Sequence, residues 1–243
     1  MDKMPWHAAF QKVESHVVKI ITPQGAGTGF LTASTSQKEM VGIATAAHVV
    51  DFAHYWKQPL RIEHFKSGET VFLNHQDRYI AIDYNRDIAS IVIPGDKLPL
   101  PDGLLPLIPQ DKRVKVGVEL GWMGFPAIAP NNLCFFTGVT SCWVEKEGFY
   151  FVDGVAINGV SGGPTLYIEN DIDLHIIGIV SAYIPNRATG AVLPGLCVVR
   201  DVMPLYRTIN DFKSFEEAKK KEITPEEPPP PPPTPASIEK TRS

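Results

Sequence analysis

A serine set among glycines is the segment of this chain best suited to chemistry: Gly159-Val160-Ser161-Gly162-Gly163-Pro164. Glycine lets the backbone turn sharply, so the N–H groups of Gly159 and Ser161 can point into one small space. A hydroxyl nucleophile beside two converging amide donors is what acyl transfer requires, because attack on a carbonyl places negative charge on its oxygen. Taken alone, the segment is equally compatible with a glycine-rich turn.

A histidine and an aspartate precede this serine in positions that suit general base catalysis. His48 follows Thr45-Ala46-Ala47, and Asp87 opens the apolar run Asp87-Ile88-Ala89-Ser90-Ile91-Val92. A serine hydroxyl needs a base to accept its proton, and histidine titrates near neutral pH. A carboxylate on the far ring nitrogen fixes the histidine tautomer. Asp83 is the rival carboxylate, but the apolar run that follows Asp87 directly places Asp87 at a strand end.

Short stretches rich in β-branched and aromatic residues must position these groups. Gly, Pro, Asn and Asp separate the stretches at short intervals, which predicts antiparallel strands rather than alternating strands and helices. The expected strands are 17–21, 28–31, 41–45, 88–93, 116–122, 134–140, 149–152, 175–180 and 196–199. Helical patterns are scarce, with candidates at 6–15, around 49–55 and at 201–222.

Proline marks two boundaries along the chain. Five prolines between Pro94 and Pro109 predict a linker at about 94–112 between two β halves. The end of the chain, 223–243, contains six consecutive prolines, Pro228 to Pro233. Its composition predicts a disordered polyproline II spacer, because it cannot bury enough apolar surface to fold. A docking motif for a polyproline-binding partner is the alternative.

The composition of the chain is that of an ordinary globular protein, with 44% hydrophobic and 21% charged residues and a formal net charge of −4. The mildly acidic balance argues against a nucleic-acid or membrane partner. Residues 1–15 lack the hydrophobic core of a signal peptide, so a cytoplasmic location is expected. Cys134, Cys142 and Cys197 lack metal-ligand spacing and are expected to be reduced, although Cys134 and Cys142 can also face each other across a hairpin. No cofactor or metal is expected.

The blocks around His48, Asp87 and Ser161 resemble the three active-site blocks of the chymotrypsin-like (trypsin-like) serine peptidases, and they occur in the same order. Other segments resemble the bacterial HtrA-like branch of that family. They are its GxGTGF strand at 25–31, its G-x-P turn at 124–126, the following strand at 137–141, and the strand that lines the primary specificity pocket at 178–181. The resemblance covers about residues 13–205.

This resemblance implies an all-β fold of two six-stranded antiparallel β-barrels. The first barrel is expected at about 13–95 and the second at about 113–205, with a C-terminal helix from about 201. Together they make a peptidase domain over residues 1–212, followed by the proline-rich tail. The PDZ domain that HtrA-like members carry is absent from the sequence, and monomer and trimer are both compatible with it.

The resemblance also implies a role for each residue of the site. Ser161 is the nucleophile, His48 the general base and Asp87 the orienting carboxylate. The N–H groups of Gly159 and Ser161 form the oxyanion hole. The Ser181 hydroxyl is expected to hydrogen-bond Asp87, while its backbone pairs with a protein or peptide substrate.

The substrate pocket follows from the same match. Val155 occupies the pocket floor, where digestive members of the family keep an aspartate, so an arginine or lysine side chain finds no carboxylate there. Ala182 and Tyr183 continue the pocket wall after Ser181, and Tyr183 stands where a glycine would leave the mouth open. The implied activity is a serine endopeptidase that cleaves after small or medium apolar residues.

Val160 departs from the family pattern. Secreted members have an acidic residue there, which pairs with a freshly cut amino terminus, so activation by removal of a short propeptide is not expected. The sequence leaves open whether the turn at Val160 is productive or flipped. A latent or inactive protease-fold binding protein is therefore the alternative function. An α/β-hydrolase esterase is excluded, because that fold places the histidine last in the chain.

Overall fold

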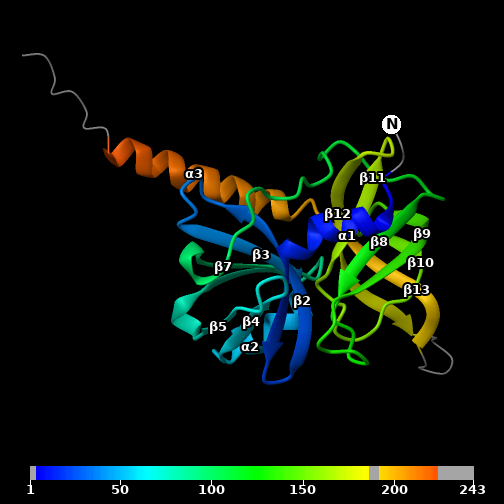
Figure 1. Ribbon diagram of the computed structural model, residues 1–243, viewed down its shortest axis with the longest axis horizontal. Helices are drawn as coiled ribbons and strands as arrows, with labels where there is room; N and C mark the ends of the chain where they lie inside the picture. Colours follow the sequence, from blue (N-terminus) through cyan, green and yellow to red (C-terminus); the bar gives the residue numbers. More distant parts are fainter. Residues whose placement is uncertain (1–3, 186–191, 224–243) are drawn as a thin grey trace, which may run out of the picture.

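The computed structural model of the protein describes residues 4–185 and 192–223, and its strands form two units that lie side by side (Figure 1). The first unit contains β1 (Val17–Thr22), β2 (Gly25–Ser34), β3 (Met40–Ala46), β4 (Leu60–His64), β5 (Thr70–Leu73), β6 (Tyr79–Asp83) and β7 (Ile88–Pro94). The second contains β8 (Glu119–Gly124), β9 (Cys134–Val144), β10 (Phe149–Asp153), β11 (Pro164–Glu169), β12 (Asp173–Pro185) and β13 (Val192–Asp201). The helices are α1 (Trp6–Val13), α2 (Ala47–Tyr55) and α3 (Leu205–Ile223), with short 3₁₀ turns η1 (Glu14–His16), η2 (His75–Asp77) and η3 (Gly95–Lys97).

The first unit is an antiparallel sheet in the order β5-β4-β1-β2-β3-β7-β6. Its inner face carries a continuous aliphatic core from β-branched and leucine side chains, such as Ile20, Leu31, Ile43, Ile62 and Ile91. In β4 buried and half-buried residues alternate along the strand, as expected of a strand with one face on a core. Among its central strands, β3 ends two residues before His48, and β7 begins directly after Asp87.

The second unit is a closed barrel in the order β10-β13-β12-β11-β8-β9. Trp122 and Tyr150 are its largest fully buried side chains. Bulges interrupt the pairing of β11 with β12 and of β12 with β13, and such bulges increase the local bend that a small closed barrel needs. The predicted all-β architecture of two antiparallel units with a C-terminal helix is confirmed.

The first unit differs in detail from the expected six-stranded barrel, because it has seven strands and stays open between β5 and β6. The guanidinium of Arg78, just before β6, donates a hydrogen bond to the carbonyl of Leu73 at the end of β5 (2.6 Å). It also donates to the carbonyl of Gln58. A side chain thus satisfies backbone acceptors where strand pairing would otherwise continue.

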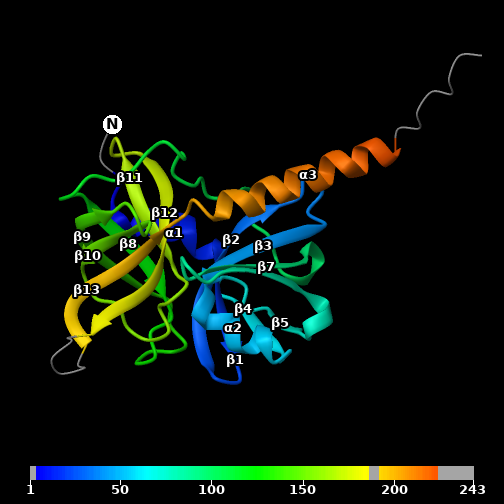
Figure 2. The same ribbon diagram turned by 180° about the vertical axis from the view of Figure 1, so that it is seen from behind.

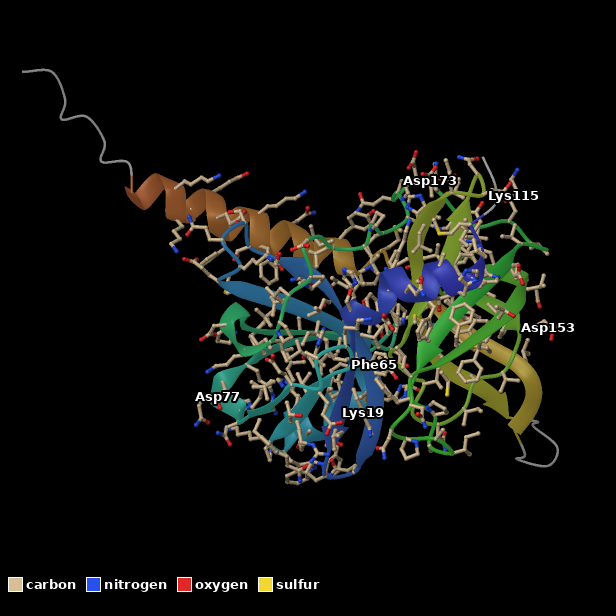
Figure 3. The ribbon with its side chains drawn as sticks, in the orientation of Figure 1. Lys19, Phe65, Asp77, Lys115, Asp153 and Asp173 are labelled. Carbon is tan, nitrogen blue, oxygen red and sulfur yellow. The ribbon has the colours of Figure 1, made fainter. Side chains whose placement is uncertain are left out.

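The helices connect and cover the two units. The ring of Trp6 in α1 packs against Phe135 of β9 (5.5 Å between centroids), so α1 lies on the second unit. Helix α3 crosses the outer face of the first sheet and continues beyond its edge (Figures 1 and 2). Leu205 and Phe212 of α3 are buried, and Thr208 donates to the Ser90 hydroxyl of β7 (2.9 Å). Phe65, near the middle of Figure 3, contacts Phe125 of the second unit with ring centroids 6.0 Å apart.

The segment 98–118 that joins the units has little regular structure, but residues within it are pinned to the second barrel. Ile108 donates its N–H to the carbonyl of Ile176 in β12 (2.9 Å), and Ile176 donates back to Pro106 (2.9 Å). Its prolines therefore belong to a fixed crossover. The proline-rich segment 224–243 lies outside the described residues, as do 186–191.

The three cysteines have free thiols. Cys134 and Cys142 lie on the same strand, β9, so the alternative of a bridge between them across a hairpin is wrong. Cys197 is buried in the second barrel, and burial raises the pKa of its thiol to about 12. In residues 4–185 and 192–223, no helix is long and apolar enough to cross a membrane.

Candidate active site

His48 stands where the first sheet meets a helix. Strand β3 ends at Ala46, and α2 begins at the next residue, so His48 is held one residue into the helix. Ala46 and Ala47 are buried, which anchors the backbone on both sides of the junction. The His48 side chain is 47% exposed and points away from the core. A rigid backbone thus presents a partly solvated imidazole.

Asp87 occupies the turn between β6 and β7 in the left-handed region, with φ of 52°. Few residues other than glycine adopt this conformation, although aspartate tolerates it better than most. Its carbonyl accepts the Ala47 N–H (3.1 Å), which joins the turn to the start of α2. The rival Asp83 has a different task, because its carboxylate accepts the N–H groups of Asn85 and Arg86 (3.1 Å each) and so shapes the turn.

The side chains of His48 and Asp87 meet directly. Nδ1 of His48 lies 2.8 Å from Oδ2 and 3.0 Å from Oδ1 of Asp87, and the His48 backbone N–H donates to Oδ1 (3.0 Å). The Ser181 hydroxyl donates a further short hydrogen bond to Oδ2, as the sequence predicts. Asp87 therefore accepts from three donors, and its carboxylate is only 19% exposed.

The electrostatics of this pair favour a charged aspartate beside a histidine that binds protons readily. The hydrogen bond that His48 donates to Asp87 raises the pKa of His48 above its ordinary value, and this outweighs the opposing effect of burial. Burial alone would raise the pKa of Asp87, but the hydrogen bonds from His48 and Ser181 lower it overall. The Nδ1 proton of His48 is consequently fixed toward the carboxylate, and Nε2 is left as the acceptor.

Ser161 lies in a loop of two successive turns between β10 and β11. Val160 donates to the carbonyl of Ile157 (3.0 Å), and Gly163 donates to the carbonyl of Val160 (3.0 Å). The third residue of each turn is a glycine with positive φ, Gly159 at 92° and Gly162 at 88°, as in type II turns. Both glycines are crowded, so an added side chain would have to adopt an unfavourable positive φ and would also collide with neighbouring atoms.

The turn at Gly159 is fixed from outside the loop. The carbonyl of Asn158 accepts the N–H of Ala127 (2.7 Å). Because a trans peptide directs its C=O and N–H to opposite sides, this bond turns the Gly159 N–H away from Ala127. Within the described part of the chain, neither this N–H nor that of Ser161 donates to a protein acceptor. Val160 is fully buried in the apolar core.

The Ser161 hydroxyl points elsewhere than expected. It donates to the carbonyl of Ser181 (3.2 Å), and within the described residues it makes no hydrogen bond to His48. The loop itself adjoins β3, the strand that ends two residues before His48, since a Cβ placed on Gly162 would lie 3.1 Å from the Ala46 nitrogen. Transfer of the serine proton to His48 therefore requires rotation of the Ser161 side chain about χ1. Catalytic hydrogen bonds are often loose before substrate binds.

The predicted pocket residues are placed unevenly by the structure. Val155 is 49% exposed, so it borders an open surface rather than a covered floor, and its carbonyl accepts the indole N–H of Trp122 (3.2 Å). Ser181 is buried on β12. Ala182 and Tyr183 follow on the same strand, opposite Val198 and Cys197 of β13, but their side chains lie outside the described residues. Across the described ranges, no group of three or more His, Cys, Asp or Glu side chains is arranged to hold a metal ion.

Sequence reasoning missed several groups around the Ser161 loop. Asn158 and Ala127 act through backbone atoms, which leave no trace in the type of side chain. Thr28 was noted only as part of a strand motif, yet it contacts the loop directly. A polar residue between two glycines of β2 was the available signal.

Comparisons with known proteins place this geometry in a recognised fold. No protein-family model matches the chain, and no curated protein matches it in sequence. Among solved structures, a serine endoprotease from Yersinia pestis superposes with a TM-score of 0.63 at 15% identity, over 87% of this chain and 68% of that one. Rv3671c from M. tuberculosis H37Rv, in an inactive form, gives 0.59 at 16% identity over 88% and 96%. Deg5 gives 0.59 at 19% identity over 82% and 88%. At these identities the likeness establishes a common fold.

Proposed function

From the chymotrypsin-like fold that the chain shares with serine endoproteases, we propose that it is a serine endopeptidase with Ser161 as its nucleophile. The observation that carries the proposal is the pairing of His48 with a buried Asp87, next to a serine loop whose two N–H groups have no described acceptor. A fold of this kind serves more than one function, so the proposal depends on these particular residues.

The chemistry follows from the atoms in place. His48 Nε2 takes the proton of Ser161 as Oγ attacks the substrate carbonyl, and the Gly159 and Ser161 N–H groups stabilise the oxyanion. Collapse of this intermediate breaks the C–N bond, and the imidazolium of His48 gives its proton to the leaving amine. Water then attacks the acyl-enzyme with His48 again as base, which releases the acid and restores Ser161. Asp87 stays ionised throughout and stabilises the imidazolium.

Labelling of the nucleophile tests the proposal most directly. Folded wild-type protein is incubated with a fluorophosphonate probe and weighed as an intact chain, with Ser161→Ala as the matched control. We expect one adduct on the wild type and none on the variant, because adduct formation needs nucleophile, base and oxyanion donors together. Absence of an adduct on folded wild type contradicts the proposal.

That negative result would favour a second function, a protease-fold binding protein with a latent or inactive site. One observation speaks for it, since the Ser161 hydroxyl donates to Ser181 and not to His48. The two functions differ in the effect of Ser161→Ala. The change abolishes hydrolysis in a peptidase, whereas it leaves partner binding by a scaffold intact.

The preference of the proposed enzyme is for small or medium apolar residues before the cut bond. Val155 offers an accessible aliphatic side chain at the expected pocket, with no charge of its own. We expect a peptide library to yield cleavage after alanine, valine or leucine. Cleavage mainly after arginine or lysine would contradict this specificity, because these side chains need a carboxylate in the pocket.

A further inference from the structure

Thr28 is a buried threonine at the contact between the two β units. It lies on β2 of the first sheet and has no exposed surface. Its backbone and hydroxyl groups all have hydrogen-bond partners at or beside the candidate active site. A buried polar residue with this many partners across an interface fixes their relative positions, because no water is available to replace a lost bond.

The hydroxyl of Thr28 joins two loops of the second unit. It donates to the carbonyl of Gly159 (2.7 Å) and accepts the N–H of Phe125 (3.1 Å). The backbone N–H of Thr28 donates to the carbonyl of Ser161 (2.8 Å). Gly159 and Ser161 are thus both held through their carbonyls, which restricts rotation of the Gly159–Val160 and Ser161–Gly162 peptides.

Thr45 extends this contact toward His48. Its hydroxyl donates to the carbonyl of Thr28 (2.7 Å), and both residues are fully buried. Thr45 lies on β3, three residues before His48. A Cβ on Gly162 would lie 1.9 Å from the carbonyl oxygen of Thr28 and 2.2 Å from the hydroxyl oxygen of Thr45, so the serine loop packs directly against this threonine pair.

We propose that Thr28 is the positioning residue of the oxyanion turn, and that Thr28 and Thr45 together set the spacing between Ser161 and His48. Four successive carbonyls of the loop then have fixed donors: Asn158 is held by Ala127, Gly159 and Ser161 by Thr28, and Val160 by Gly163. The carbonyls of Asn158 and Val160 share peptide planes with the N–H groups of Gly159 and Ser161, and Thr28 fixes the peptide that follows each of these N–H groups. The two N–H groups therefore keep one orientation without a charged partner at Val160. This role rests on the proposed peptidase function.

The test replaces the Thr28 hydroxyl by a methyl group of the same shape, Thr28→Val. This leaves the Gly159 carbonyl and the Phe125 N–H without their partner. We expect kcat to fall about tenfold to hundredfold, with KM little changed, because small displacements of catalytic groups cost this much. The rate of fluorophosphonate labelling of Ser161 should fall in parallel. Thr28→Ser keeps the hydroxyl and should restore both values toward wild type.

Thr32→Val is the matched control. Thr32 is also a buried threonine of β2, but its hydroxyl donates to the Gly42 carbonyl within the first sheet (3.3 Å) and has no bond to the serine loop. Its loss should lower the melting temperature without lowering kcat. Thr45→Val, with Thr45→Ser as its rescue, gives a second test of the pair should Thr28→Val fail to fold.

Each outcome decides the proposal. The proposed role is supported if kcat falls in folded Thr28→Val, recovers in Thr28→Ser and stays unchanged in Thr32→Val. The same pattern at Thr45 supports it as well. A wild-type kcat in folded Thr28→Val overturns the role of Thr28, and so does a loss of kcat in Thr28→Ser or Thr32→Val equal to that in Thr28→Val. In either case, labelling of Ser161 in the wild type still supports the peptidase function. Absence of labelling in the wild type overturns both.

Discussion

Replacing Asp87 with asparagine is expected to lower kcat for peptide hydrolysis by about 10⁴-fold while the fold is retained. Asp87 accepts from His48 Nδ1, from the His48 backbone and from the Ser181 hydroxyl. An amide offers one oxygen in place of two and adds N–H donors. If the amide nitrogen faces Nδ1, the ring proton moves to Nε2, which can then no longer accept the proton of Ser161.

The variant should also change the pH dependence of kcat/KM. In the wild type, activity is lost as pH falls through the pKa of His48, because the protonated ring cannot act as a base. The hydrogen bond that His48 donates to Asp87 is the main cause that raises this pKa above its ordinary value. Removal of the carboxylate lowers the pKa, so the residual activity of Asp87→Asn should persist to lower pH than that of the wild type.

Asp83→Asn is the control for this experiment. Asp83 lies in the same turn, four residues earlier, and accepts the N–H groups of Asn85 and Arg86. An asparagine oxygen can accept the same bonds, so its kcat should stay near wild type. Retention of most activity in folded Asp87→Asn, or an equal loss in Asp83→Asn, would contradict the assignment of Asp87 as the orienting carboxylate.

The sequence was informative about the fold wherever apolar runs are long and bounded by turn residues. Strands β1, β3 and β7 begin or end within a residue or two of their predicted limits, because β-branched residues recur along each strand. The missed strands β4, β5, β6 and β11 carry charged residues on their outer face or are only a few residues long. Their strand character depends on pairing with distant neighbours and not on local pattern.

The open edge of the first sheet shows the same limit. Strands β5 and β6 follow each other along the chain, but they are the two edges of the sheet, so their pairing depends on how the five strands between them are arranged. Arg78, between β5 and β6, instead bonds the Leu73 carbonyl. An arginine in a loop gives no sign of this from sequence. Closure of the barrel was therefore expected from the resemblance alone, and the seventh strand was not expected.

The candidate site was predictable in its side chains and less so in its backbone. The motifs mark all three residues whose side chains meet: His48 just after β3, Asp87 just before β7 and Ser181 within β12. The orientation of the Gly159 peptide depends on Ala127 and Thr28, which approach from loops and strands far away in sequence. Such bonds cannot be derived from residue types, and neither can the rotamer of Ser161.

Gly159→Ala is the second change with a large expected effect, a fall of about 10²–10³-fold in kcat, as for the loss of one oxyanion donor. Gly159 has φ of 92°, and an added Cβ would lie 2.2 Å from the Phe125 carbonyl oxygen. Alanine is unfavourable at this position of a type II turn. The strain is relieved most directly by a flip of the Asn158–Gly159 peptide, which breaks the bond to Ala127 and turns the Gly159 N–H out of the proposed oxyanion hole.

The measurement compares kcat, KM and the melting temperature of Gly159→Ala with those of Gly103→Ala. Gly103 has no atom within 4 Å of its added Cβ and no positive φ, so its replacement should leave all three values near wild type. A flipped peptide lowers kcat far more than it raises KM, because an oxyanion donor acts mainly in the transition state. Wild-type kcat in folded Gly159→Ala would mean that the Gly159 N–H takes no part in the reaction, and that the Ser161 N–H stabilises the oxyanion without it.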